Sequence, residues 1–85
     1  MFYTYVLKSK KDRKLYIGCT DNLRRRFTEH QNGLSPATRY REPWVLIYYE
    51  AYLEKSDAQK RERQLKKFST AYGELKKRIV ASNED

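Results

Sequence analysis

The feature that most constrains the fold is a pair of β-favouring segments near the start of this 85-residue chain. FYTYVLK and KLYIGC are rich in aromatic and β-branched residues, and the charged stretch KKDR separates them. Residues 2–19 are therefore predicted to form a β-hairpin. Alternation gives each strand an aromatic face, which includes Tyr5 in the first strand and Tyr16 in the second. A turn centred near Lys10 and Lys11 would place these two tyrosines opposite each other.

A capped helix is predicted directly after the hairpin. Asp21 or Asn22 can accept a hydrogen bond at the N-terminus of a helix that begins at Leu23. The pair Asn32-Gly33 tolerates the left-handed conformation that ends many helices. The next segment, LSPATRYREP, is expected to be a loop.

The remaining chain is predicted to add one strand and two helices. The near-continuous apolar segment WVLIYYEAY favours a central strand that is buried on both faces. Ser56 and Gln59 have the capping-box spacing, so a helix is predicted from about Asp57 to Lys67. A last amphipathic helix is expected at about residues 70–81, before a frayed SNED tail. Its apolar positions are Tyr72, Leu75, Ile79 and Val80.

The size and charge of the chain limit the number of domains and the kind of partner that it can have. A chain of this length makes one domain, 1–85, with its core at about 2–68. Nineteen Lys or Arg against eleven Asp or Glu give a formal charge of +8, which attracts polyanions at long range. Nucleic acid is the first candidate partner, and the alternative is a basic protein that binds no polyanion.

Cysteine usage and hydropathy exclude several other classes. The single cysteine, Cys19, excludes an internal disulfide and a cysteine-rich zinc site. No apolar run approaches the ~18 residues of a membrane span, and the start MFYTYVLKSKK lacks the layout of a signal peptide. We therefore expect a cytoplasmic protein without a membrane partner.

The three consecutive arginines of the first helix are not equivalent. Each helical residue advances by about 100°, so Arg24 and Arg25 turn towards solvent or a phosphate backbone. Arg26 and His30, four residues apart, lie at the edge of the apolar stripe and close to the sheet. His30 could act in catalysis or could only complement the helix dipole.

A carboxylate interrupts the apolar face of the predicted helix after residue 56. Ala58, Glu62 and Leu65 fall on one face, and a buried unpaired charge is costly. Glu62 therefore needs a metal ion or a cationic partner, and a structural pair with Arg26 is one alternative. Cys19 is predicted to be a small packing residue. Tyr5 and Tyr16 could alternatively be ordinary packing residues of the hairpin.

Taken together, the segments YTYVL, LYIGCTDNLRRRFTEH and QKRERQLK resemble the GIY-YIG nuclease superfamily, specifically its small stand-alone bacterial proteins. The resemblance extends from Tyr3 to about Lys67. YIG alone is a weak signal. Its specificity comes from the spacing to a tyrosine eleven residues upstream, an arginine ten residues downstream and a helical glutamate. The resemblance implies an α+β fold, a three-stranded antiparallel β-sheet flanked by α-helices.

The resemblance also implies a phosphodiester-cleaving site with one divalent metal ion, Mg²⁺ or Mn²⁺. By position, it assigns the catalytic residues Tyr5, Tyr16, Arg26, His30 and Glu62. Gly18 belongs to the second motif, and Glu62 would be the metal ligand. The first motif reads Tyr-Thr-Tyr in place of Gly-Ile-Tyr, and Cys19 stands where repair nucleases of the superfamily carry lysine.

Three functions remain open at this stage. The first is a metal-dependent endonuclease-like domain that hydrolyses phosphodiester bonds in DNA repair or processing. The second is a catalytically weak or inactive nucleic-acid-binding module, and the third, with less support, is an adaptor that binds a protein partner. DNA is favoured over RNA, and a homodimer or a protein partner would supply target specificity. Nucleic-acid contacts are expected from Arg24, Arg25, Arg39, Arg41, Lys60, Arg63, Lys66 and Lys67.

Overall fold

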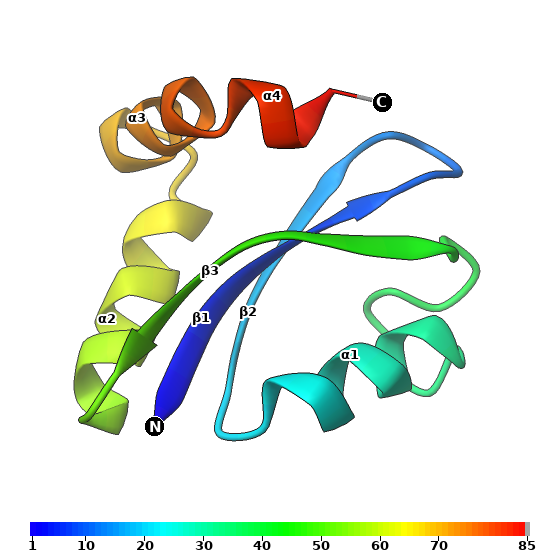
Figure 1. Cartoon of the computed structure of the whole chain (residues 1–85), viewed down its shortest axis with the longest axis horizontal. Coiled ribbons are helices and arrows are strands. Elements are labelled where there is room, and N and C mark those ends of the chain that lie inside the picture. The colour runs from blue at the N-terminus through cyan, green and yellow to red at the C-terminus, as the bar shows by residue number, and fades with distance from the viewer. Residues whose placement is uncertain (85) are drawn as a thin grey trace.

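The computed structural model describes residues 1–84 as one three-stranded antiparallel sheet with helices on both faces (Figure 1). Its elements are β1 (Phe2–Ser9), β2 (Leu15–Thr20), α1 (Leu23–Gln31), β3 (Trp44–Tyr52), α2 (Lys55–Lys66), α3 (Thr70–Arg78) and α4 (Val80–Asn83). The strand order is β2-β1-β3. The predicted α+β class with a three-stranded antiparallel sheet is confirmed.

Two apolar clusters pack against opposite faces of the sheet. Alternation along β1 sends Tyr5 and Leu7 to one face, where they meet Trp44 and the apolar side of α1. Val6 faces the other way and packs with Leu65 of α2 and the apolar side of α3. The sheet therefore separates α1 from α2, as Figure 1 shows.

The hairpin is confirmed, but its expected register is wrong. Tyr5 lies opposite Gly18, and Tyr16 lies opposite Leu7. The turn is centred later than expected because Ser9 accepts hydrogen bonds from the backbone of the next residues through its Oγ, and Arg13 adopts a left-handed φ of 66°. A Cβ added at Gly18 would lie only 2.5 Å from Tyr5 Cζ, so the tyrosine ring requires a glycine opposite it.

The expected central position of β3 is also wrong. The central strand is β1, whose residues Thr4, Tyr5, Val6 and Leu7 are all buried. β3 is an edge strand, with α1 on one face and α2 and α4 on the other. Its two faces are only partly covered, because Val45 and Tyr49 are exposed and Trp44 alone is buried, so the expected burial on both faces is wrong as well.

The first two helices differ in how well their caps were predicted. The side-chain oxygen of Asn22 accepts a hydrogen bond of 3.0 Å from the Arg25 N–H, which confirms the predicted start of α1. The capping box that begins at Ser56 is wrong. α2 begins at Lys55 after Glu54, and the described residues supply no side-chain hydrogen bond to that cap. Only two residues join β3 to α2, so the helix starts before the serine.

The C-terminal segment forms two helices in place of the single one expected. α3 ends at Arg78, and the short α4 follows after Ile79, which is buried in the core. The break turns Val80 outwards, contrary to its expected apolar contact. The SNED tail starts within α4, and Asp85 lies outside the described residues. Within residues 1–84, no helix has the length and apolar character needed to cross a membrane.

Candidate active site

The candidate site is built on β2, because this strand lies at an edge of the sheet. The α1 residues on one face and the α2 residues on the other can both reach side chains at such an edge. Tyr16 projects from β2 to the α1 side, where its ring centre lies 5.2 Å from that of His30. It is half-buried, whereas Tyr5 on the central strand is almost completely buried.

A buried hydrogen-bond chain runs from β1 through α1 to the following loop. The Tyr5 hydroxyl lies 2.8 Å from His30 Nε2, and His30 Nδ1 lies 2.6 Å from Thr38 Oγ1. Burial, together with the positive charge of Arg26, lowers the pKa of His30 to about 4. The imidazole is therefore neutral near pH 7, with one nitrogen that donates and one that accepts. A neutral His30 does not provide the positive charge that would complement the dipole of α1.

Arg26 is held by two neighbours and remains partly open to solvent. Its Nη1 donates to Glu29 Oε1 at 2.9 Å, and its Nη2 donates to Ser35 Oγ at 3.1 Å. Its side chain is 30% exposed, so its guanidinium can still meet a ligand. Arg24 and Arg25 are exposed. The three arginines thus have the different environments that helical periodicity predicts.

Glu62 reaches the same edge from α2. Its carboxylate is 22% exposed and forms an ion pair of 2.9 Å with Lys66, whose Nζ lies 5.9 Å from the ring centre of Tyr16. Arg26 is paired with Glu29 instead. The alternative of a structural pair between Arg26 and Glu62 is therefore replaced by two separate pairs.

The hydroxyl of Tyr5 is held in its protonated form. Burial raises its pKa, the nearby Tyr16 and Glu62 add to the rise, and the charge of Arg26 opposes it. Burial likewise raises the pKa of the Cys19 thiol, with a further contribution from Glu62. Glu62 and Cys19 also line one cavity, on the face of the sheet that α2 covers.

A cavity of about 380 Å³ lies beside Glu62 and offers oxygen ligands to a cation. Its lining includes Asp21 and Thr20, and Mg²⁺ favours one or two carboxylates completed by water and substrate phosphates. No group of three or more potential ligands from His, Cys, Asp and Glu occurs within residues 1–84. The carboxylates of Glu62 and Asp21 could therefore hold a divalent cation only together with water and substrate oxygens, in a cavity that Lys55 also lines.

Comparison with known proteins decides the family. The sequence model of the GIY-YIG catalytic domain matches residues 1–77. The chain belongs to the GIY-YIG family. This membership confirms the resemblance inferred from the motifs, and it relates the chain to nucleases at the level of the family.

Two curated relatives and one solved structure extend the comparison. A UPF0213 protein of Clostridium perfringens is 44% identical over 70 residues, which cover 81% of this chain and 74% of the relative. A UPF0213 protein of Natronomonas pharaonis is 42% identical over 80 residues, covering 93% and 89%. The solution NMR structure of the UPF0213 protein BH0048 from Bacillus halodurans has 32% identity and a TM-score of 0.54, and covers 88% and 81%.

Two loop residues of this GIY-YIG domain were not identified as site residues from the sequence. Ser35 and Thr38 are buried, and each contacts one of the residues assigned to catalysis. A polar loop has no periodicity that would point one hydroxyl inwards. Trp44, also buried beside Tyr16, was read only as a strand residue.

The basic residues expected to bind nucleic acid divide into two groups. Arg41 donates to Asp12 at 2.7 Å and lies 4.8 Å from the ring centre of Trp44, so it fastens the loop to the hairpin turn. The others that project outwards are Arg24, Arg25, Arg39, Lys60, Arg63, Lys66 and Lys67. Arg61, which was not included, holds α2 to β3 through both carboxylate oxygens of Glu50.

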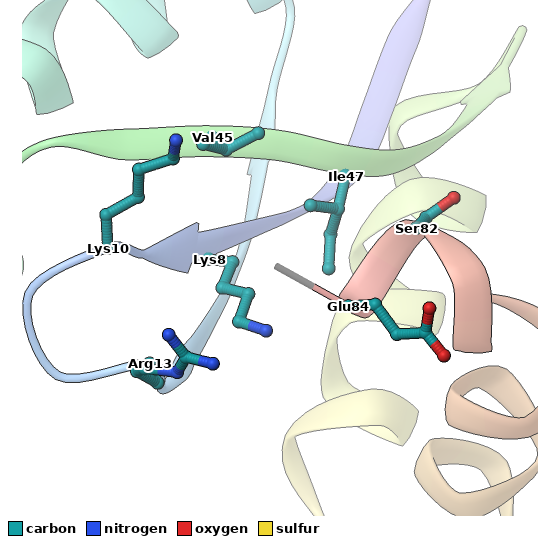
Figure 2. Close-up of a pocket in the computed structure, with 7 residues that line it drawn as sticks. All are labelled: Lys8, Lys10, Arg13, Val45, Ile47, Ser82 and Glu84. Atoms are coloured by element: carbon teal, nitrogen blue, oxygen red, sulfur yellow. The ribbon is translucent and has the colours of Figure 1, made fainter.

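A second basic region lies on the other face of the sheet. A cavity of about 350 Å³ lies there, and its lining includes Lys8, Arg13, Ile47 and Glu84. Figure 2 shows how these side chains lie. The Lys8 ammonium donates a hydrogen bond to the carbonyl of Asn83 in α4. Lys8 thereby fastens the C-terminal helix to the hairpin, on the face of the sheet opposite to Tyr16.

Proposed function

We propose that this protein is a divalent-metal-dependent endonuclease that hydrolyses phosphodiester bonds. The observation that supports the proposal is that the ring of Tyr16 on β2 lies against His30, one helical turn after Arg26 in α1, and also near Lys66, which pairs with Glu62 in α2. Its net charge of +8 supports a polyanionic substrate. We assign DNA as the preferred nucleic acid and DNA repair or processing in the cytoplasm as the setting.

Arg26 is proposed to bind the reacting phosphate. Glu29 and Ser35 fix its guanidinium, which offers several donors in one plane. Negative charge builds on the phosphate oxygens as water attacks phosphorus, and a fixed cation stabilises that charge most at the transition state. A lysine at this position would keep the charge but lose the planar arrangement of donors.

Tyr16 is proposed to orient the attacking water. Tyr5 is proposed to act as a buried positioning residue through its contact with His30. Tyr16 is accessible at the edge strand, whereas the Tyr5 hydroxyl is buried against His30 and has a raised pKa. The neutral His30 can accept or donate a proton at Nε2, so it holds the Tyr5 hydroxyl in one orientation.

Glu62 is the proposed metal ligand, with Asp21 and Thr20 beside it in the same cavity. A bound Mg²⁺ or Mn²⁺ would neutralise charge on phosphate oxygens and polarise water. The Lys66 ammonium now pairs with Glu62 and would have to give way to the cation.

The second candidate is a nucleic-acid-binding module that cleaves weakly or not at all. It is favoured by the Tyr-Thr-Tyr first motif and by Cys19, which provides no cation beside the phosphate. Labelled DNA and RNA of single-stranded, duplex and branched form, incubated with Mg²⁺, Mn²⁺ or chelator, separates the two. Cutting that requires metal and is lost in Glu62→Gln supports the endonuclease. Binding without cutting under every condition supports the module.

A further inference from the structure

The loop between α1 and β3 presents one aromatic side chain to solvent. Tyr40 is 74% exposed and has a φ of 73°. A bulky residue in the left-handed region is uncommon, because its Cβ crowds the backbone there. Such a conformation persists where the surrounding structure imposes it, and it is often found where a ligand is held.

Contacts at Tyr40 and at the next residue, Arg41, impose the conformation of Tyr40. Lys11 Nζ donates to the Tyr40 carbonyl at 2.9 Å, and Ser9 Oγ donates to the carbonyl of Arg41 at 2.6 Å. The ion pair between Arg41 and Asp12 adds a third attachment to the hairpin turn. The backbone that carries the phenol ring is therefore fixed, although the side chain itself is exposed.

The ring of Tyr40 also contacts a cationic side chain. The guanidinium carbon of Arg39 lies 5.5 Å from the ring centre of Tyr40, and Arg39 is exposed. An accessible aromatic face beside an arginine combines a surface on which a base stacks with a group that binds phosphate. A duplex keeps its bases stacked on each other, so only an unpaired base can offer its face to such a ring.

The same loop also lines the candidate site. Thr38, two residues before Tyr40, contacts His30, and Ser35 contacts Arg26. The inner side of the loop thus holds two proposed catalytic residues while its outer side carries Arg39 and Tyr40. A phosphate bound by Arg26 would therefore lie beside Ser35, five residues before Tyr40 in the same loop.

We propose that Tyr40 and Arg39 form a subsite that stacks an unpaired nucleobase of the bound nucleic acid and contacts an adjacent phosphate. The location beside the reacting phosphate rests on the proposed function. Base stacking itself requires no cleavage and is tested without it.

The test uses the full chain in chelator with single-stranded oligonucleotides that carry 2-aminopurine at successive positions. Stacking on Tyr40 should quench the fluorescence of one position. Tyr40→Ala should abolish that quenching and weaken binding on the order of tenfold. Tyr40→Trp should retain both effects. Arg39→Gln should weaken binding and make the salt dependence shallower by about one unit of slope.

Leu34→Ala is the matched control, since Leu34 lies in the same loop and is 69% exposed but has no ring. It should bind and quench like the parent, and thermal melting should show that all four variants are folded. Equal binding by Tyr40→Ala and the parent overturns the subsite, as does equal competition by a blunt duplex of the same sequence. Quenching that depends on Tyr40 in a protein that never cuts would sustain the subsite and refute only the endonuclease.

Discussion

The hydroxyl of Tyr5 and the Nε2 of His30 lie 2.8 Å apart inside the protein, where neither residue is accessible to solvent. Tyr5 comes from the central strand and His30 from the last turn of α1, so this single contact joins the sheet to the helix that carries Arg26. It also depends on His30 remaining neutral, because a buried imidazolium would be costly.

His30 should make stability depend on pH. Burial, then the charge of Arg26, lowers its folded pKa to about 4 from an ordinary 6.5. Between these values the unfolded chain binds the proton and the folded chain does not, so stability is complete above pH 6.5 and declines as pH falls towards 4. The expected loss is about 3 kcal/mol, measured by urea unfolding from pH 7.5 to 4.5.

His30→Gln is the control for this titration, because glutamine keeps a polar side chain that has no charge to gain. Its unfolding free energy should vary much less over the same range. Asp12, whose folded pKa is about 2 because of hydrogen bonds from Arg41 and the Lys14 backbone, titrates below this window. An identical pH slope in both proteins would mean that His30 is not the group responsible.

Thr38 should affect cleavage without touching the substrate. Thr38→Val keeps the shape but removes the hydroxyl that His30 contacts, which leaves a buried nitrogen unsatisfied. We expect about 1–3 kcal/mol less stability and a lower cleavage rate with unchanged DNA affinity. Thr28→Val is the matched control, since the Thr28 hydroxyl donates to an α1 carbonyl at the exposed surface. Similar losses of cleavage in both variants would contradict the positioning role.

Gly18 should be intolerant of even one methyl group. The added Cβ of Gly18→Ala would overlap the phenol of Tyr5, which is fixed by His30 and cannot move aside. We expect a loss of about 1–3 kcal/mol or more in a denaturant titration. Gly73→Ala is the opposite case, because no neighbouring atom lies within 4 Å of the added Cβ and Gly73 is inside α3. That change should stabilise the protein by up to about 1 kcal/mol.

The sequence predicted local structure better than the arrangement of strands. The Asn22 cap and the Asn32-Gly33 end of α1 depend only on residues close in sequence, so they could be predicted from the local sequence. The edge position of β3 depends on which strands pair, and an apolar run carries no information about that pairing. The hairpin register was missed for a similar reason, since Ser9 extends the turn through side-chain hydrogen bonds.

The candidate site shows the same limit. Helical spacing separated Arg26 from Arg24 and put Glu62 on the inner face of α2, because both arguments use one helix at a time. The partners of these residues come from elsewhere in the chain. Ser35 lies in a loop without periodicity, and no spacing rule connects it to Arg26.

Substitutions at the three consecutive arginines should have different effects on cleavage and on DNA binding. Arg26→Lys keeps the charge but loses the fixed planar donors, so single-turnover cleavage should fall by on the order of a hundredfold. Arg24→Ala and Arg25→Ala remove exposed charges and should weaken DNA binding modestly with little effect on cleavage. Rates measured at saturating protein separate these outcomes. Equal reductions at all three positions would mean that the triplet is only a basic surface.

Glu62 gives the sharpest prediction, because its partner in the structure is Lys66 and not Arg26. A partly exposed ion pair of this kind contributes no more than about 1 kcal/mol, so Glu62→Gln should melt within a few degrees of the parent in metal-free buffer. It should bind DNA as well as or better than the parent, since a negative charge near the phosphate is gone. It should not cut DNA with Mg²⁺ or Mn²⁺.

Lys66→Gln tests the role of the Glu62 carboxylate by removing its ion-pair partner. Without the ammonium, Glu62 is available to a cation, so Mn²⁺ should bind more tightly than in the parent, as followed by calorimetry without DNA. Lys67→Gln removes a neighbouring exposed charge and corrects for the change in net charge, since the ion pair of Glu62 is with Lys66. Mn²⁺ binding that is equal in the Lys66 and Lys67 variants, or cutting that survives Glu62→Gln, would remove Glu62 from the metal site.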